Sequence, residues 1–326
     1  MTTAISVLQN LFPFKNFDAV MTTLEAISEL HTRDSAYQID IGTLESITAA
    51  AASRGRHAIC LKVWDMLDTQ GIQPTETMYE NTCTAFIMAF RQDENGFAVL
   101  GEMEAKGYTP SRALIRSLSR SLRISVGRVD SDYNFLVRNE IAGARVSKSS
   151  LHVIMAACAE LGEVDRVFAT MEDFDSRGIE LDEDSYSYLM EALSKATGAD
   201  RIFSKSAAGQ YLAAAESMLG TMTEKNIKIN RHTLHYYVHT LGNLGYAKEA
   251  CNAVLDALEF GLEVDNKTLN LLITDCGKTG DSDMAKFLCS KLTEPMEFLE
   301  KRFETWQVAQ AEDTTGLLKD ESETTG

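Results

Sequence analysis

Five arginines lie in one stretch of the sequence, residues 111–128, with no acidic residue between them. They are Arg112, Arg116, Arg120, Arg123 and Arg128. Arg112, Arg116 and Arg120 are spaced by four, so they share one face of a predicted helix. Guanidinium groups bind phosphate and carboxylate oxygens through paired hydrogen bonds. The spacing therefore predicts either a clamp for such anions or a solvated face whose arginines pair with Asp and Glu of neighbouring helices.

Three histidines lie on another predicted helix. They are His232, His235 and His239, and the last two are spaced by four. A pair of imidazoles at this spacing could meet a metal ion from one face. However, no cysteine or third ligand stands at a defined spacing, and no glutamate lies between the two histidines. We therefore expect no metal, and interpret the pair as facing a binding groove, where it could stack on a base or bond a partner's backbone.

The remaining reactive residues form no catalytic pattern. The six cysteines never form a Cys-x-x-Cys pair, and those on predicted helices are interpreted as small core residues in a reducing compartment. The acidic run at residues 182–184 lies where a helix begins, a position at which acidic side chains stabilise the helix. No phosphate-binding glycine loop or nucleophile elbow is present. The sequence predicts no catalytic residue, no cofactor and no small-molecule substrate.

A turn recurs along the chain at a nearly constant interval. Its first residues are Gly71, Gly107, Gly143, Gly178, Asn226 and Gly261. The steps between them are 36, 36, 35, 48 and 35 residues. An insertion of about 13 residues within 197–209 explains the one long step. A fixed period of this size predicts a solenoid, in which each unit buries its apolar face against its neighbours.

A second set of glycines lies about halfway between these turns. They are Gly55, Gly127, Gly162, Gly245 and Gly280. Between the two kinds of glycine, apolar residues recur three and four apart, as in Leu61, Trp64 and Leu67, which lead up to Gly71. We therefore predict an all-α fold, a right-handed superhelical solenoid of antiparallel helix pairs with repeats of about 35 residues.

The turns resemble the end of the pentatricopeptide repeat, which runs about 35 residues and closes on a pattern close to Met-x-x-x-Gly-x-x-Pro-Asp. The segments 102–110 and 66–74 are similar to it, while Gly178 to Asp182 and Gly261 to Asp265 keep the glycine and the aspartate without the proline. The tetratricopeptide pattern, with its period of 34, fits less well. The resemblance covers residues 36–295, and implies that the first helix of each pair lines a concave groove into which the arginine row points.

The resemblance also implies a pair of base-reading residues in each repeat, one early in the first helix and one after the turn. The pairs are Glu45 with Thr75, Glu80 (or Asn81) with Ser111, Arg116 with Ser147, His152 with Asp182, Ser187 with Asn230, and His235 with Asp265. Of these, Ser187 with Asn230 has the usual residue types. A glutamate would face the nucleic acid with a like charge, which disfavours a strand at the first two units. The predicted groove residues are Arg112, Arg116, Arg120, Arg123, Ser187, Asn230, His235 and His239.

The sequence divides into four parts. Residues 1–36 are predicted to form a degenerate helix pair, residues 37–295 the repeat array with its insertion at 197–209, residues 296–308 a capping helix, and residues 309–326 an acidic disordered tail. No apolar run is long enough for a membrane span. No Arg-rich transit peptide is visible at the start. Because the family's members are mostly organellar, we expect a mitochondrial or plastid protein whose presequence is not visible.

The net charge separates two functional hypotheses. The chain has 31 Lys and Arg against 48 Asp and Glu, a formal charge of −17, whereas a protein that neutralises phosphates usually has a clear basic surface. The family resemblance and the arginine row favour a non-enzymatic organellar factor in RNA processing, stability or translation that binds single-stranded RNA. The acidic charge and the incoherent reader pairs favour a purely protein-binding subunit or assembly scaffold of an organellar complex.

Overall fold

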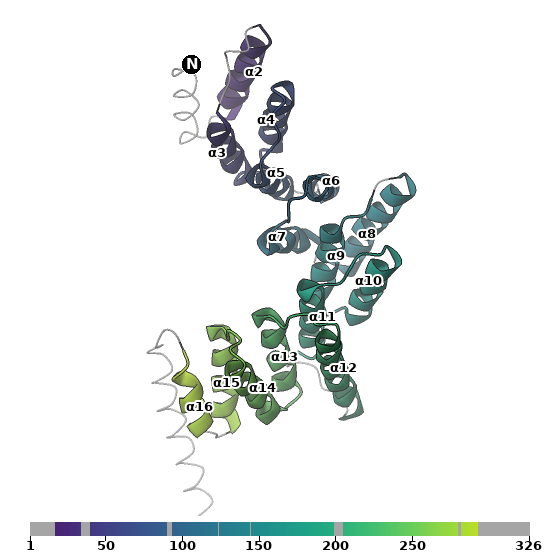
Figure 1. The fold of residues 1–326 in the computed structure, drawn as a ribbon, viewed down its shortest axis with the longest axis vertical. Coiled ribbons are helices and arrows are strands. Elements are labelled where there is room, and N and C mark those ends of the chain that lie inside the picture. The colour runs from purple at the N-terminus through teal and green to yellow at the C-terminus, as the bar shows by residue number, and fades with distance from the viewer. Residues whose placement is uncertain are drawn as a thin grey trace, which may run out of the picture. The chain divides into compact units, whose positions relative to one another are not determined.

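The computed structural model describes residues 17–33, 40–89, 93–122, 124–143, 145–198, 205–279 and 282–292. Within these ranges it contains fifteen α-helices and no β-strand (Figure 1). The helices are α2 (Phe17–Arg33), α3 (Ile41–Ala52), α4 (His57–Thr69), α5 (Glu76–Met88), α6 (Asp93–Ala105), α7 (Arg112–Leu122), α8 (Val126–Ile141), α9 (Lys148–Leu161), α10 (Val164–Ser176), α11 (Glu183–Ala196), α12 (Lys205–Glu224), α13 (Arg231–Asn243), α14 (Ala247–Glu259), α15 (Asn266–Thr279) and α16 (Ser282–Cys289).

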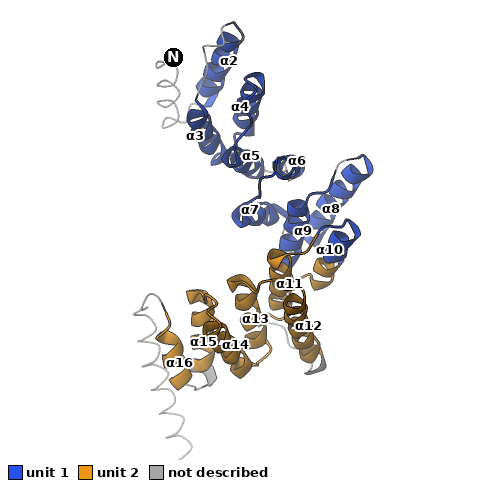
Figure 2. Ribbon diagram, viewed as in Figure 1, with its two compact units in different colours: residues 1–161, 169–179 blue, residues 162–168, 180–326 orange. Residues whose placement is uncertain are grey.

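The chain forms two compact units (Figure 2). Unit 1 comprises residues 1–161 and 169–179, and unit 2 comprises residues 162–168 and 180–326. In unit 1 the first helices α3, α5, α7 and α9 each pack against the next, and the second helices α4, α6 and α8 pack beside their partners. In unit 2, α11, α13 and α15 form the same kind of layer, paired with α12, α14 and α16. The predicted all-α fold of repeating helix pairs is confirmed.

The recurring turns all adopt one backbone conformation. Gly71, Gly107, Gly143, Gly178 and Gly261 have positive φ, and so does Asn226, at +54° the one non-glycine residue with positive φ in the described ranges. At Gly71 the next residue closes the turn, because the Ile72 N–H donates to the Leu67 carbonyl at 2.9 Å. The same bond recurs between Ile227 and Met222 at 2.7 Å. This is the Schellman ending of a helix, and asparagine is the non-glycine residue best suited to it.

The second set of glycines is confirmed in part. Gly55, Gly162 and Gly245 have positive φ between the first and second helices of their repeats. Gly127 instead lies inside the first turn of α8, because Ser125 accepts a hydrogen bond from the Arg128 N–H and begins the helix there. Gly280 is outside the described residues.

The insertion lengthens a second helix. Helix α12 has 20 residues, whereas α4, α6, α10 and α14 have 13 each. Residues 205–209 of the predicted insertion form the first turn of α12, and 199–204 lie outside the described ranges. The predicted first segment, from Asp18 to Leu30, is helical as part of α2, which packs against α4. Residues 1–16, the capping helix at 296–308 and the tail at 309–326 lie outside the described residues, and these boundaries stay predictions.

The core consists of apolar residues at helical spacing from both layers. In unit 1 it includes Leu24, Leu44, Val63, Leu67 and Met78, each fully buried. The cysteines belong to this core: Cys60, Cys83, Cys158, Cys251 and Cys276 are buried and Cys289 is half-buried, all as free thiols. Burial raises the pKa of the Cys60 thiol to about 12, so this sulfur stays protonated and behaves as a small apolar group.

Candidate functional site

The residue after each recurring turn caps the next first helix. In α13, the Asn230 side chain accepts from the His232 and Thr233 N–H groups, both at 3.0 Å. In α11, Asp182 forms a capping box with Ser185, as the acidic run at residues 182–184 predicted. Asp40, Thr75, Ser111, Ser147 and Asp265 accept the corresponding bond from the residue three positions later. In every predicted reader pair, the residue after the turn therefore has a structural role at the start of a helix.

The glutamates of the first two reader pairs are bonded to those capping residues. The Thr75 hydroxyl donates to Glu45 Oε1, and the Ser111 N–H donates to Glu80 Oε1 at 3.0 Å. These bonds join α3 to the start of α5, and α5 to the start of α7, across separations of 30 and 31 residues. The two carboxylates thus link neighbouring repeats.

The arginine row lies along α7, which contains no acidic residue. The guanidinium of Arg116 lies 3.7 Å from the carboxylate of Glu160 on α9, the next first helix, and its side chain is 16% exposed. Arg112 is half-buried and Arg120 is exposed, while Arg123 lies outside the described residues. Arg116 therefore pairs with an acid of the next first helix, as the solvated-face reading expects, and the anion clamp stays a prediction.

Ser187 lies in α11 with no exposed surface. Its predicted partner Asn230 is half-buried, with its side-chain oxygen bonded to two backbone N–H groups of α13. Ser187 is therefore inaccessible to solvent and Asn230 is only partly accessible, although both have the residue types of a base-reading pair. A side chain becomes available to a base only if it stays exposed, and that depends on how neighbouring helices cover it.

His235 and His239 lie one turn apart on α13, with ring centroids 6.3 Å apart. The Thr268 hydroxyl donates to Asp265 at 2.6 Å, so it must accept from His235 Nδ1, 2.9 Å away. His239 Nδ1 instead accepts, since the Asn243 amide lies 3.0 Å away and donates to it. The two imidazoles therefore carry their protons on opposite ring nitrogens. In the described ranges, no three His, Cys, Asp or Glu side chains gather to hold a metal ion.

Burial lowers the pKa of both histidines below the ordinary value of 6.5. Nearby Asp265 partly opposes this at His235, and the charge of His235 adds to it at His239. As the pH falls below 6.5, the unfolded chain takes up these protons before the folded one does. We expect the stability of unit 2 to be fully present above about pH 6.5 and to decline below it. Urea unfolding at about pH 7.5 and about pH 5.5 measures this.

The matched variant is His235→Gln with His239→Gln. Neither glutamine titrates, so the loss of stability between these two pH values should shrink. An undiminished loss in the double variant would assign the pH dependence to other groups.

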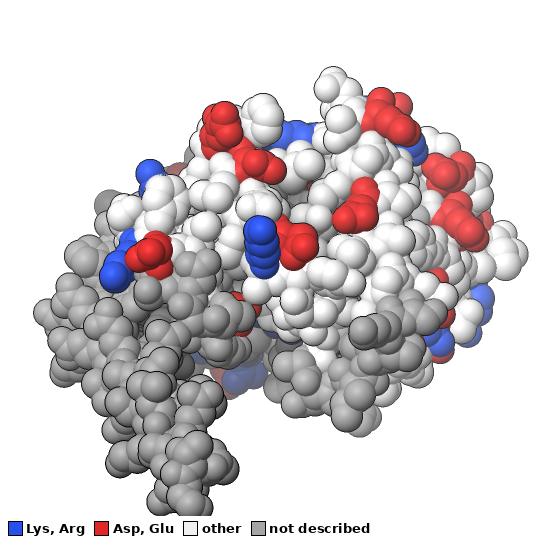
Figure 3. All heavy atoms as spheres, turned by 90° about the horizontal axis from the view of Figure 1, so that it is seen from below, with Lys and Arg blue, Asp and Glu red and all other residues white. Residues whose placement is uncertain are grey.

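Many acidic side chains bind groups of a neighbouring helix. Arg177 donates to both carboxylate oxygens of Glu140, at 2.9 and 2.8 Å, and to Asp173 at 2.6 Å, while the Tyr133 hydroxyl donates to the other Asp173 oxygen. The Glu104 carboxylate accepts from the Lys148 and Ser149 N–H groups at the start of α9. On the face shown in Figure 3, acidic and basic side chains are interspersed. Part of the acidic excess therefore stabilises the repeats.

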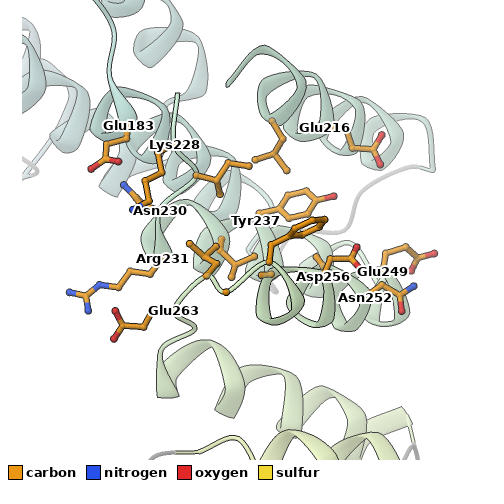
Figure 4. Close-up of a pocket in the computed structure, with 18 residues that line it drawn as sticks. Glu183, Glu216, Lys228, Asn230, Arg231, Tyr237, Glu249, Asn252, Asp256 and Glu263 are labelled. Carbon is orange, nitrogen blue, oxygen red and sulfur yellow. The ribbon is translucent and has the colours of Figure 1, made fainter. Parts of the chain in front are cut away.

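A pocket of about 1030 Å³ opens in unit 2 between α12, α13 and α14 (Figure 4). Its apolar lining includes Leu219, Leu234 and Tyr237, and its charged residues are mainly acidic. No motif in the sequence predicted this pocket. One signal for it was present in the sequence: Phe260 precedes a recurring turn at a position where most other repeats have Gln, Lys or Arg.

The helix pairs, the recurring turns and the capped first helices define a helical-repeat protein. Residues 41–174 match the family described as pentatricopeptide repeat-containing protein. This match confirms the resemblance to the pentatricopeptide repeat seen in the turns at Gly71 and Gly107. No curated protein sequence matches the chain significantly. No helix in the described residues is long and apolar enough to cross a bilayer.

Several crystal structures are similar to the chain. The pentatricopeptide repeat protein PPR10 from maize is 17% identical, with 96% of this chain and 49% of that chain covered and a TM-score of 0.47. PPR10 in complex with an 18-nt psaJ RNA element is 15% identical, with 94% of this chain and 47% of that chain covered and a TM-score of 0.44. The pentatricopeptide repeat domain of Arabidopsis thaliana protein-only RNase P 1, in complex with tRNA, is 13% identical, with 60% of this chain and 97% of that chain covered and a TM-score of 0.45. The chain spans about half the length of PPR10.

Proposed function

We propose that this chain is a non-enzymatic scaffold that binds single-stranded RNA in organellar RNA metabolism, in the processing, stability or translation of a transcript. The observation that carries the proposal is the face of α7, where Arg112, Arg116 and Arg120 follow one another without an acidic residue in the helix. Guanidinium groups in such a row can pair with phosphates along a strand. A mitochondrion or plastid is the proposed compartment, on the family resemblance alone.

The contact we propose is with the RNA backbone and not with the bases in the first two repeats. Glu45 and Glu80 hold the starts of the next helices, and a carboxylate there offers a base no donor. Phosphate contacts position a strand without reading its sequence. Binding at α7 should therefore depend strongly on salt and weakly on sequence.

The salt dependence of RNA binding tests this. The Arg116→Ala, Arg120→Ala double variant should bind a fluorescent single-stranded RNA of mixed sequence more weakly. The slope of log K against log salt should fall by about 0.7 for each of the two arginines that contacts a phosphate of the single strand. Fluorescence anisotropy over a series of salt concentrations measures this slope.

Arg138→Ala with Arg145→Ala is the matched control. Both side chains are exposed in unit 1 and lie outside α7, and the change in net charge is the same. This control should leave the slope nearly unchanged. An equal reduction of the salt slope in the two double variants would mean that overall charge, and not the face of α7, governs RNA binding.

The second candidate function is a purely protein-binding subunit or assembly scaffold of an organellar complex. The observation that favours it is that the glutamates at the first two reader positions are bonded within the protein. In that case wild-type protein should not bind RNA even at low salt. Its partners, isolated with the tagged chain from the organelle, should then survive ribonuclease.

A further inference from the structure

The pocket of unit 2 has an apolar floor within reach of solvent. Leu219 comes from α12, Leu234 and Tyr237 from α13, and Ala253 and Ala257 from α14. Its volume of about 1030 Å³ is at the upper end of the range of ligand pockets in proteins, about 300–1,000 Å³. The pocket can therefore hold one or two large side chains of a bound segment.

Phe260 lines this pocket and is 88% exposed. The residue before the recurring turn is Gln70, Lys106, Ala142, Arg177 or Lys225 in the other repeats. A polar or small side chain is suited to this solvent-facing place, whereas a phenyl ring leaves apolar surface in water. A single exposed aromatic residue is ordinary, but here it adjoins an apolar pocket. The ring therefore extends that apolar surface to the pocket's edge.

Acidic side chains surround this apolar surface. Figure 4 shows Glu216 of α12 on one wall and Glu249 and Asp256 of α14 on the other, with Tyr237 between them. Burial raises the pKa of the Tyr237 hydroxyl, and the charges of Glu216 and Glu249 raise it further. These two carboxylates therefore create a negative potential at the tyrosine.

The opposite end of the pocket is of mixed charge. Lys228 and Arg231 lie there together with Glu183 and Glu263 (Figure 4). Within the part of the chain that the structure describes, none of the pocket's five carboxylates forms an ion pair. The end formed by Glu216, Glu249 and Asp256 thus has three unneutralised acids and no basic residue.

We propose that this pocket binds a basic segment of a partner protein, with a large apolar side chain seated against Leu234 and Phe260 and Lys or Arg residues beside Glu216 and Glu249. Aromatic residues at such sites contribute much of the binding energy. Complementary charge around them speeds association and selects the partner. This site lies in unit 2, apart from α7, and does not depend on RNA binding.

The pocket does not suit a nucleic acid. A phosphate at the Tyr237 end would meet Glu216, Glu249 and Asp256 and no basic residue of the pocket, and like charges brought together are repelled. A basic peptide meets the opposite situation, since each Lys or Arg gains a carboxylate. The charge around the pocket therefore favours the peptide over RNA.

Selection of random 12-residue displayed peptides on the full chain tests the proposal. The expected winners contain a Leu, Phe, Trp or Met with at least two Lys or Arg nearby. A selected peptide, synthesised with a fluorophore, should bind Phe260→Gln at least about tenfold more weakly than wild type. Glu216→Gln with Glu249→Gln should weaken binding similarly and reduce its salt dependence.

Two matched variants in unit 2 serve as controls. Phe168→Gln changes another exposed phenylalanine, and Glu224→Gln with Glu259→Gln removes two exposed carboxylates outside the pocket. Both should leave peptide affinity unchanged, and circular dichroism of every variant verifies the fold. Selection of no peptide or of acidic peptides, equal losses in the controls, or displacement of the peptide by single-stranded RNA would each overturn the proposal.

Discussion

Gly55→Ala should destabilise unit 1 by about 3 kcal/mol or more, a loss at the upper end for single substitutions. Gly55 has a φ of +64°, and a Cβ there would lie 2.8 Å from the carbonyl carbon and oxygen of Met88 and 2.9 Å from the Ala89 nitrogen. The left-handed conformation alone costs alanine about 1–2 kcal/mol. The remainder arises because those atoms belong to the backbone at the end of α5, which cannot rotate away as a side chain can. Urea unfolding with hydrogen exchange across α3 to α5 measures the effect.

Two other glycines with positive φ give the matched series. A Cβ at Gly71 has nothing within 4 Å, so Gly71→Ala should cost only the conformational part, about 1–2 kcal/mol. At Gly162 the nearest atom is the Ala196 nitrogen at 3.2 Å, and the loss should be intermediate. Equal losses at Gly55 and Gly71 would show that the close approach to α5 has no energetic consequence.

Arg177→Ala should cost about 2 kcal/mol of stability in unit 1. The side chain is 15% exposed and joins Glu140 on α8 to Asp173 on α10. Removing a partly buried partner leaves two carboxylates less satisfied, which costs about 1–3 kcal/mol. Arg177→Lys should recover only part of the loss, because an ammonium group cannot make the paired bonds to Glu140. Chemical unfolding of the three proteins measures the difference.

Arg138→Ala is the control for this experiment. Arg138 is exposed, and its guanidinium donates a hydrogen bond to the Asn134 carbonyl of its own helix at 3.2 Å. The Arg138→Ala variant should lose no more than about 0.5 kcal/mol of stability. Full recovery of stability in Arg177→Lys would mean that charge, and not the geometry of the guanidinium, stabilises the packing of α8 on α10.

The two proposed interactions involve different surfaces. RNA binding is assigned to α7 in unit 1, and the basic peptide to the pocket of unit 2. Loss of RNA binding in the Arg116, Arg120 variant should leave the peptide bound, and Phe260→Gln should leave RNA bound. Each experiment therefore tests its own proposal, and the failure of one leaves the other intact.

The arginine row shows how far the sequence predicts the candidate site. Spacing by four placed Arg112, Arg116 and Arg120 on one helix, and α7 confirms that helix. The sequence left open whether acids neutralise the row. The contact between Arg116 and Glu160 joins residues 44 positions apart, so it follows from the packing of α7 on α9 and from no local pattern.

The helix pairs, their period and their turns could be predicted from the sequence alone. These depend on neighbours within one or two helical turns: apolar spacing, a left-handed residue such as Gly71 or Asn226, and a capping side chain such as Asp182. By contrast, the bonds from Glu45 and Glu80 to the next repeats, the burial of Ser187 and the pocket between α12, α13 and α14 follow from how the helices pack. A side chain's exposure and partners depend on which helices stack beside it, and those helices lie beyond the neighbours that decide its local conformation.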